Sequence, residues 1–264
     1  MKAIDMHMHL GVSSASMVNV PEVVELYRRN DVLAIPIAWD EETRTGRPAL
    51  DNDILAKQVK ENSGVFISGW ACVDPWKGAL AVKEAERAVK ELGLLGLKFQ
   101  QAAQEFFPND RRFYPLWEKC VDLKIPVLFH LGTTGYGANE PGGAGIHLKY
   151  TQPIPYLDDV AADFPELTIV GAHPAWPWQE EMLAIVLHKT NVHIDLSGWS
   201  PKYFPESLKR DVNGRLQDRV MFGSDHPFIP LERWLADFER EGYKAEVVEK
   251  VLYKNAQRIL GLRV

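Results

Sequence analysis

The sequence has 264 residues, of which 46% are hydrophobic and 25% charged, values typical of a globular protein with a large core. The net charge of −6 argues against a nucleic-acid partner, and no apolar run approaches the ~20 residues of a membrane span. Cys72 and Cys120 are too few for a disulfide framework, and Asp5 stands where a signal peptide needs an apolar stretch. We therefore expect a cytoplasmic protein that acts on a small molecule.

Apolar runs rich in β-branched residues alternate with helical patterns along the whole chain. The expected pairs of a strand and the helix after it are 3–9 and 21–30, 32–39 and 51–62, 65–73 and 78–92, 94–99 and 113–123, 126–131 and 154–164, 167–172 and 178–189, 192–196 and 202–217, and 219–224 and 231–241. A further helix is expected over 245–260.

Eight such units in about this length predict a single α/β domain, residues 1–264, folded as a (β/α)8 TIM barrel with a C-terminal helix. A doubly wound open sheet is the alternative. That fold usually has fewer strands and often a glycine-rich phosphate turn, and the sequence contains neither G-x-G-x-x-G nor a P-loop.

The expected strands end on titratable residues, where a barrel places its chemistry. Five of the eight histidines lie at such ends, together with a lysine and an aspartate. The strand-end residues are His7, His9, Lys98, His130, His173, Asp225 and His226. Random scatter would not concentrate imidazoles in this way, so the pattern predicts a functional site.

The pair His7-x-His9 is the sharpest element, because side chains two apart on a strand point to the same face. We expect both imidazoles, and Asp5 behind them, to face the barrel interior. A metal ion would satisfy them, and His130 and Asp225 can complete an N3O set that suits Zn2+ best, with Mn2+, Co2+ or Fe2+ as alternatives. Taken singly, these residues also fit ordinary core histidines and a capping aspartate.

The motifs together resemble the amidohydrolase superfamily, in particular the amidohydrolase-2 branch similar to amino-carboxymuconate-semialdehyde decarboxylase. The segments that carry the resemblance are Asp5-Met6-His7-Met8-His9, Gly96-Leu97-Lys98, 126–130, 170–174, 222–225 and 254–260. The resemblance implies one zinc ion per chain held by His7, His9, His130 and Asp225. It also implies that His173 is an acid/base beside the metal, and that the protein forms a homodimer.

The role of Lys98 is open at this stage between a carbamylated bridge of two metals, a contact to a substrate anion and a salt bridge at the rim. Arg44, Arg47 and His147 lie in expected loops with several aromatic residues, including Trp176 and Trp178. Guanidinium groups beside flat apolar walls suit a planar anionic substrate. The aromatic residues could equally pack loops or form a dimer surface, and the glycine-rich loop 133–149 could be a lid or a mobile surface loop.

From these features we expect a metal-dependent hydrolase acting on an ester, lactone, thioester or activated C–C carbonyl of a small acid. Metal-activated water would attack, His173 would stabilise the oxyanion, and Asp225 would pass the proton of the water to the leaving group. The alternative is a non-oxidative, metal-dependent decarboxylase of an aromatic or muconate-type acid. A catalytically dead barrel that serves as a binding protein is a third reading.

Overall fold

Among residues 3–11 and 16–264, which the computed structural model describes, eight parallel strands lie side by side in chain order. The strands are β1 (Ala3–His9), β2 (Val32–Ile37), β3 (Trp70–Ala71), β4 (Gly96–Phe99), β5 (Val127–His130), β6 (Ile169–Ala172), β7 (Val192–Asp195) and β8 (Val220–Met221). The segment that follows β8 returns to β1, where Met8 pairs with His226 and the N–H of Met6 donates to the carbonyl of Phe222. These contacts complete the (β/α)8 barrel that the sequence predicts.

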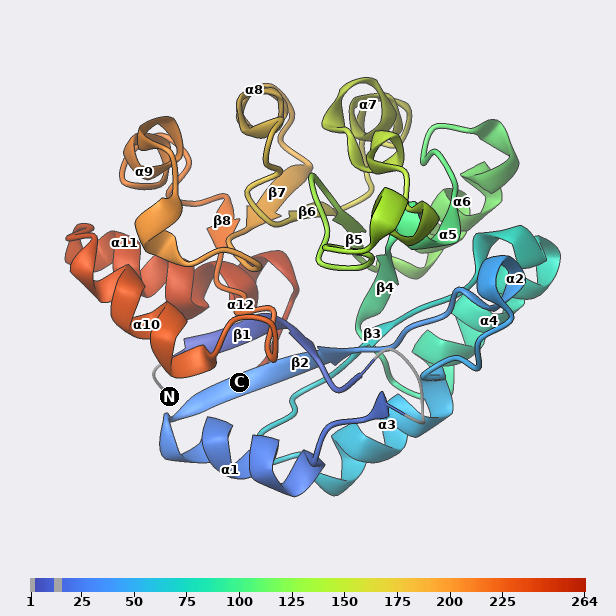
Figure 1. The fold of residues 1–264 in the computed structure, drawn as a ribbon, viewed down its shortest axis with the longest axis horizontal. Helices are drawn as coiled ribbons and strands as arrows, with labels where there is room; N and C mark the ends of the chain where they lie inside the picture. Colours follow the sequence, from blue (N-terminus) through green and yellow to red (C-terminus); the bar gives the residue numbers. More distant parts are fainter. Residues whose placement is uncertain (1–2, 12–15) are drawn as a thin grey trace.

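Helices surround the strands (Figure 1). They are α1 (Val20–Arg29), α2 (Glu42–Thr45), α3 (Asn52–Glu61), α4 (Ala79–Lys90), α5 (Gln101–Gln104), α6 (Tyr114–Leu123), α7 (Asp158–Asp163), α8 (Gln179–His188), α9 (Glu206–Val212), α10 (Leu231–Arg240), α11 (Ala245–Glu249) and α12 (Asn255–Ile259). Short 3-10 turns and two π turns connect them: η2 (Pro75–Lys77), η3 (Arg111–Phe113), η4 (Pro141–Gly145), η5 (Leu148–Thr151), η6 (Pro153–Leu157), η7 (Pro201–Tyr203) and η8 (Lys250–Lys254). In the described part of the chain, no helix combines the length and apolarity needed to cross a membrane.

Several boundaries differ from the predicted ones. β3 and β8 are shorter than the apolar runs 65–73 and 219–224, because the ends of these runs are buried without pairing as regular strands. The expected helix 202–217 is divided into η7 and α9, with Pro205 between them, a residue that lacks the N–H a continuous helix would need. The expected C-terminal helix runs through α11, η8 and α12 without a break.

A bulge in β1 changes the facing of its side chains. Asp5 pairs with Ala34 and Met8 with Pro36, so β1 has one more residue than β2 between these pairs. Ile4 packs in the inner hydrophobic cluster of the barrel, whereas Met8 belongs to the outer core.

The expectation that Asp5 faces inward behind the two histidines is therefore wrong. Its carboxylate accepts hydrogen bonds from Tyr27 of α1, at 2.7 Å, and from Ser224 beyond β8. Because of the extra residue, the inward and outward alternation of side chains along β1 reverses after Met6. The side chain of His7 therefore points toward the strand ends.

Candidate functional site

A cavity of about 290 Å³ lies at the carboxyl ends of the strands. Trp39, Tyr136 and Phe228 give it aromatic walls, and its polar lining combines imidazoles with an ammonium and a carboxylate. The ionisable or imidazole-bearing lining residues are His9, Lys98, His130, His173 and Asp225. The barrel thus brings most of the predicted strand-end residues to one place.

The imidazoles and the carboxylate are close enough to share a ligand. Oδ1 of Asp225 lies 3.4 Å from Nε2 of His7 and 3.2 Å from Nε2 of His9. Nε2 of His173 lies 3.1 Å from Nδ1 of His130. His7, His173 and Asp225 each offer one donor atom, and these three atoms all lie within 4.8 Å of one another.

Two residues that the sequence reasoning missed orient these rings from behind. Oδ2 of Asp195 lies 2.9 Å from Nδ1 of His7, and the hydroxyl of Ser197 lies 3.0 Å from that atom and 2.9 Å from Nδ1 of His173. His130 uses its Nε2 to contact the carbonyl of Thr133 at 3.1 Å. Nε2 of His7 is thereby left facing Asp225, while Nε2 of His173 and Nδ1 of His130 face each other. Contacts of this kind orient the rings of metal-binding histidines.

A signal for these partners was present in the sequence. Strand 192–196 was one of three expected strands to which no strand-end group was assigned. Asp195 and Ser197 nevertheless stand at its end, with the two-residue spacing that had singled out His7 and His9.

Burial sets the protonation of this cluster. Burial lowers the pKa of His7 to about 4, although Asp195 opposes this, and burial also lowers the pKa of His130 and of His173. Burial raises the pKa of Asp225, but the hydrogen bond with His9 and the neighbouring imidazoles outweigh it and lower the value to about 2. Neutral imidazoles beside an ionised carboxylate are the form that binds a divalent cation.

Unpaired nitrogen atoms in the cluster also fit a divalent cation. Nε2 of His7 and Nδ1 of His9 are buried and have no hydrogen-bond partner. Buried polar atoms are normally paired, so unpaired imidazole nitrogens in a cluster with a carboxylate fit a group of residues that holds a cation. Imidazole and carboxylate together suit Zn2+ or another divalent transition metal.

Lys98 of β4 lies in the same cavity. It is 2% exposed, and its Nζ has no hydrogen-bond partner. Burial lowers the pKa of this amine to about 8, while Asp195 and Asp225 oppose the shift. Among the residues that line the cavity, Lys98 carries the one lysine or arginine cation.

The two arginines expected at the substrate lie outside the cavity lining. Nε of Arg44 lies 2.9 Å from the carboxylate of Glu105, and Arg47 donates to the hydroxyl of Tyr136 at 2.5 Å. Both guanidinium groups therefore connect loops, and Arg47 reaches the cavity only through Tyr136.

The other residues expected at the substrate also lie apart from the lining. His147 is exposed in the loop before η5, and Trp176 is 49% exposed and packs against Trp199. Trp178 is half-buried directly before α8. None of these three side chains lines the cavity.

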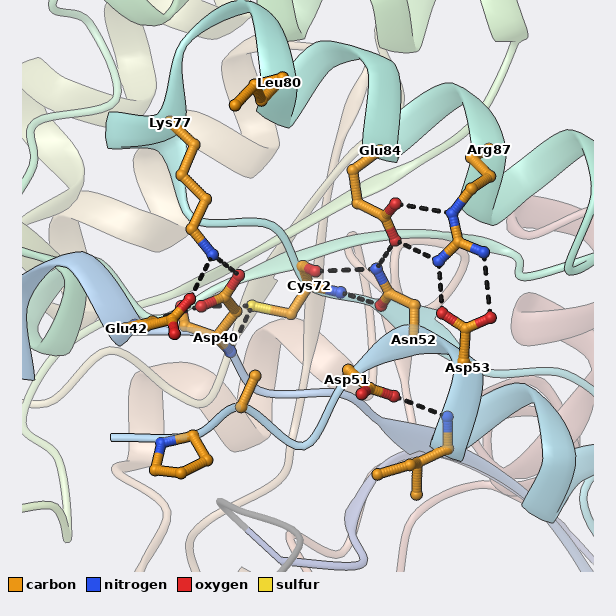
Figure 2. Close-up of a pocket in the computed structure, with 13 residues that line it drawn as sticks. Asp40, Glu42, Asp51, Asn52, Asp53, Cys72, Lys77, Leu80, Glu84 and Arg87 are labelled. Atoms are coloured by element: carbon orange, nitrogen blue, oxygen red, sulfur yellow. Dashed lines mark hydrogen bonds and ion pairs between the residues drawn. The ribbon is translucent and has the colours of Figure 1, made fainter. Parts of the chain in front are cut away.

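A larger hollow of about 590 Å³ lies between α3, α4 and the loop after β2 (Figure 2). Its charged groups bind one another: Lys77 with Asp40 and Glu42, and Arg87 with Asp53 and Glu84. Asn52 connects the backbone of Cys72 to Glu84 in the same network. These contacts hold two helices and a loop together, whereas Nδ1 of His9 and Nζ of Lys98, both buried and unpaired, belong to residues that line the smaller cavity.

A (β/α)8 barrel with histidines and an aspartate gathered at its strand ends defines a class of barrel enzymes that work with a divalent metal. The family model described as amidohydrolase matches residues 4–262, and the chain belongs to this family of enzymes.

Its curated relatives include Decarboxylase orsB of Emericella nidulans, 23% identical over 257 residues that cover 79% of this chain and 74% of that protein. Gamma-resorcylate decarboxylase of Polaromonas sp. is 23% identical over 248 residues, covering 80% of this chain and 75% of that protein.

Two solved structures show the same fold. An uncharacterized TIM-barrel protein from Bordetella bronchiseptica superposes with a TM-score of 0.81 at 21% identity, covering 99% of both chains. Dihydroxybenzoic acid decarboxylase from Polaromonas sp., solved with bound manganese and the inhibitor 2-nitroresorcinol, superposes with a TM-score of 0.70 at 18% identity, covering 99% of this chain and 98% of that one.

These relatives correct the expected reaction. From the sequence we expected hydrolysis ahead of decarboxylation, although no residue distinguished the two, but the two curated proteins named above are decarboxylases. Both chemistries use the same ligand types at the same strand ends, so those residue types alone did not distinguish them. The resemblance to the amidohydrolase-2 branch is confirmed.

Proposed function

We propose that this protein is a metal-dependent, non-oxidative decarboxylase of a planar aromatic acid. The observation that carries the proposal is the cavity, in which the unpaired ammonium of Lys98 and three aromatic walls face one cluster of imidazoles. A flat apolar slot with a single cation suits a ring that carries a carboxylate. The names of the relatives support this class, since gamma-resorcylate and dihydroxybenzoic acid are both hydroxylated benzoic acids.

His7, His9, His130 and Asp225 would hold the metal, as one divalent ion per chain. Zn2+ suits the donor set, and Mn2+ is equally consistent with it and is the ion bound in the Polaromonas structure. Bound there, the ion would act as a Lewis acid that draws electron density from the oxygen atoms of the substrate.

Side chains of the cavity would hold the substrate. The ammonium of Lys98 would pair with the negative charge of the acid, which explains a buried amine with no partner in the protein. Trp39, Tyr136 and Phe228 would hold the ring flat. This arrangement would present the carbon that carries the carboxylate to His173.

The reaction needs one proton and no oxidant. Nε2 of His173 would give its proton to the ring carbon, the bond between that carbon and the carboxylate would break, and its electron pair would restore the aromatic ring as CO2 leaves. Burial lowers the pKa of His173, so the ring is mostly neutral near pH 7, and the minor protonated form is a stronger acid than a free imidazolium. Water would then return the proton to His173.

The proposal is tested by incubating the manganese-loaded protein with 2,6-dihydroxybenzoate and related hydroxybenzoates in D2O. We expect release of CO2 and a phenol that carries one deuterium at the carbon that held the carboxylate. Absence of CO2 from every acid in the panel, at one bound metal per chain, would overturn the proposal.

Removal of the Lys98 cation gives a second test. Lys98→Met should raise KM about tenfold or more, because the substrate carboxylate loses its partner. Lys60→Met, at an exposed lysine in α3, is the matched control and should leave KM unchanged. An unchanged KM in Lys98→Met would remove Lys98 from the substrate site.

A further inference from the structure

One wall of the cavity is formed by a short segment of the loop after β5. Residues 134–137 line the cavity, and the ring of Tyr136 faces that of Trp39 with 6.0 Å between centroids. The same segment approaches Phe228, whose ring would lie 3.9 Å from a Cβ placed on Gly135. The position of this segment therefore sets the width of the slot that a ligand must enter.

Two residues from the segment after β2 hold the hydroxyl of Tyr136. It donates a hydrogen bond to Oε1 of Glu41 at 2.7 Å and accepts one from Nη1 of Arg47 at 2.5 Å. The guanidinium carbon of Arg47 also lies 5.7 Å from the centroid of the Tyr136 ring. A side chain from one loop is thus fixed by two side chains from another.

The carboxylate of Glu41 is unusually buried for a group that connects two loops. It is 3% exposed, its Oε2 is buried without a hydrogen-bond partner, and Arg47 lies 3.7 Å from its other oxygen. Burial of a carboxylate with an unpaired oxygen is costly, and an exposed residue could join two surface loops without that cost. The arrangement is explained if the exact placement of the Tyr136 ring is needed.

The inner end of the segment is fixed as well. Thr134 accepts a hydrogen bond from Nε2 of Gln100 at 3.0 Å and one from the N–H of Tyr136 at 3.1 Å. Gln100 itself lies at the end of β4 and is buried. Tyr136 is therefore held from the barrel side through its backbone and from the solvent side through its hydroxyl.

We propose that Tyr136 is the specificity-determining wall of the active site, and that Glu41 and Arg47 are positioning residues that hold its ring against the cavity. This rests on the proposed function, since the ligand is taken to be a planar aromatic acid. Held in place, Tyr136 keeps the slot narrow, so a flat ring enters and a puckered ring of similar size is rejected.

The test compares binding of benzoate and cyclohexanecarboxylate to the manganese-loaded protein by calorimetry. The two acids share a carboxylate and differ in the planarity of the ring. The wild type should bind benzoate at least tenfold more tightly. Glu41→Leu and Tyr136→Phe should each release the ring of Tyr136 and widen the slot. Benzoate should then bind more weakly and cyclohexanecarboxylate more tightly, so that the preference for benzoate falls about tenfold.

Two further variants separate positioning from general disruption. Glu41→Gln keeps an oxygen that accepts from Tyr136 and should retain most of the preference for benzoate. Glu42→Leu changes the neighbouring acid, which is exposed and pairs with Lys77, and should leave both affinities unchanged. Turnover provides a second readout: in Glu41→Leu the KM for a hydroxybenzoate should rise about tenfold with kcat within twofold, because the proton donor His173 is not displaced.

The inference would be overturned if the preference for benzoate survived in both Glu41→Leu and Tyr136→Phe. It would also be overturned if the variants lost affinity for both acids equally. A wild type with no preference for the flat acid would overturn it too. Failure of the proposed function has a different signature: no CO2 would be released from hydroxybenzoates, while the preference for the flat ring would still depend on Glu41.

Discussion

Gln101 pairs with the backbone of His130 in the way that a neighbouring strand would. Its Nε2 donates to the carbonyl of His130 at 3.1 Å, and its Oε1 accepts from the N–H of His130 at 3.0 Å. The side chain of Gln101 is only 1% exposed, so both bonds are shielded from water. One amide from α5 thereby fixes the backbone that carries one of the proposed metal ligands.

We predict that Gln101→Leu weakens metal binding about 10- to 100-fold, the range typical for loss of a residue that orients a ligand. Titration of the metal-free protein with Mn2+ against a chromophoric chelator measures the effect. Gln104→Leu is the matched control, because that amide lies in the same short helix and bonds to Asp40 and Val73 instead. It should lower stability by about 1–3 kcal/mol without changing metal affinity. An equal loss of metal affinity in both variants would contradict a specific role for Gln101.

At the scale of elements, the segment directly after β8 lies very close to its two neighbours in the site. A Cβ on Gly223 would lie 2.8 Å from Cβ of His7 on β1 and 2.9 Å from Cβ of Ser197 after β7. Real Cβ atoms do not approach this closely, so the backbone of β8 reaches His7 only because residue 223 has no side chain.

Gly223→Ala should therefore push His7 and Ser197 apart. We expect a loss of about 1–3 kcal/mol in the free energy of unfolding, as for other overpacked sites, together with weaker metal binding. Urea denaturation and Mn2+ titration measure the two effects. Gly64→Ala, where a Cβ would meet nothing within 4 Å, should change neither. Normal metal affinity in Gly223→Ala would show that the strand ends can separate without cost to the site.

The elements also show what could be predicted from the sequence. The alternation of apolar runs and helices predicted the barrel, because each strand is buried on both faces and reads as a continuous apolar run. Imidazoles at the ends of those runs predicted the site for the same reason, since polar residues interrupt an apolar pattern visibly. The bulge that turns Asp5 away from the site depends on the register between β1 and β2, which no local pattern in β1 records.

The loops were harder to interpret. Arg44 and Arg47 looked like contacts for an anion because they are cations in a loop after a strand. Their actual partners, Glu105 and Tyr136, lie far away in the sequence and are brought close only by the closed barrel. The cation in the cavity is Lys98, whose burial follows from its position on β4. Which side chain reaches a cavity is thus decided by tertiary contacts between loops.

At the scale of the whole molecule, buried ionisable groups make stability depend on pH. Burial lowers the pKa of His7, His130, His173 and His193, so each takes up a proton when the metal-free protein unfolds at mildly acidic pH. Asp5 acts in the opposite direction, because burial raises its pKa to about 7 and the folded state holds the extra proton. The histidines outnumber Asp5, so stability should fall as pH falls from 6.5 to 4.

His193 on β7 isolates one of these contributions, because it is not among the residues that line the cavity. Its ring is mostly buried, its Nδ1 has no hydrogen-bond partner, and burial, reinforced by Arg219 and Arg258, lowers its pKa to about 3. Between pH 3 and 6.5 the unfolded chain therefore binds a proton at this residue that the folded chain does not. The stability linked to His193 is complete above pH 6.5 and is lost progressively as the pH falls toward 3, at about 1.4 kcal/mol per pH unit.

We predict that His193→Gln lowers the slope of unfolding free energy against pH by about 1.4 kcal/mol per pH unit between pH 4 and 6, because the variant has one proton fewer to bind on unfolding. Urea denaturation of the metal-free protein at several pH values gives the slope, and the chelator present throughout keeps metal loss out of the comparison. His188→Gln, at an exposed residue at the end of α8, is the control and should leave the slope unchanged. A wild-type slope in His193→Gln would mean that the buried ring of His193 already carries a proton in the folded state over this pH range.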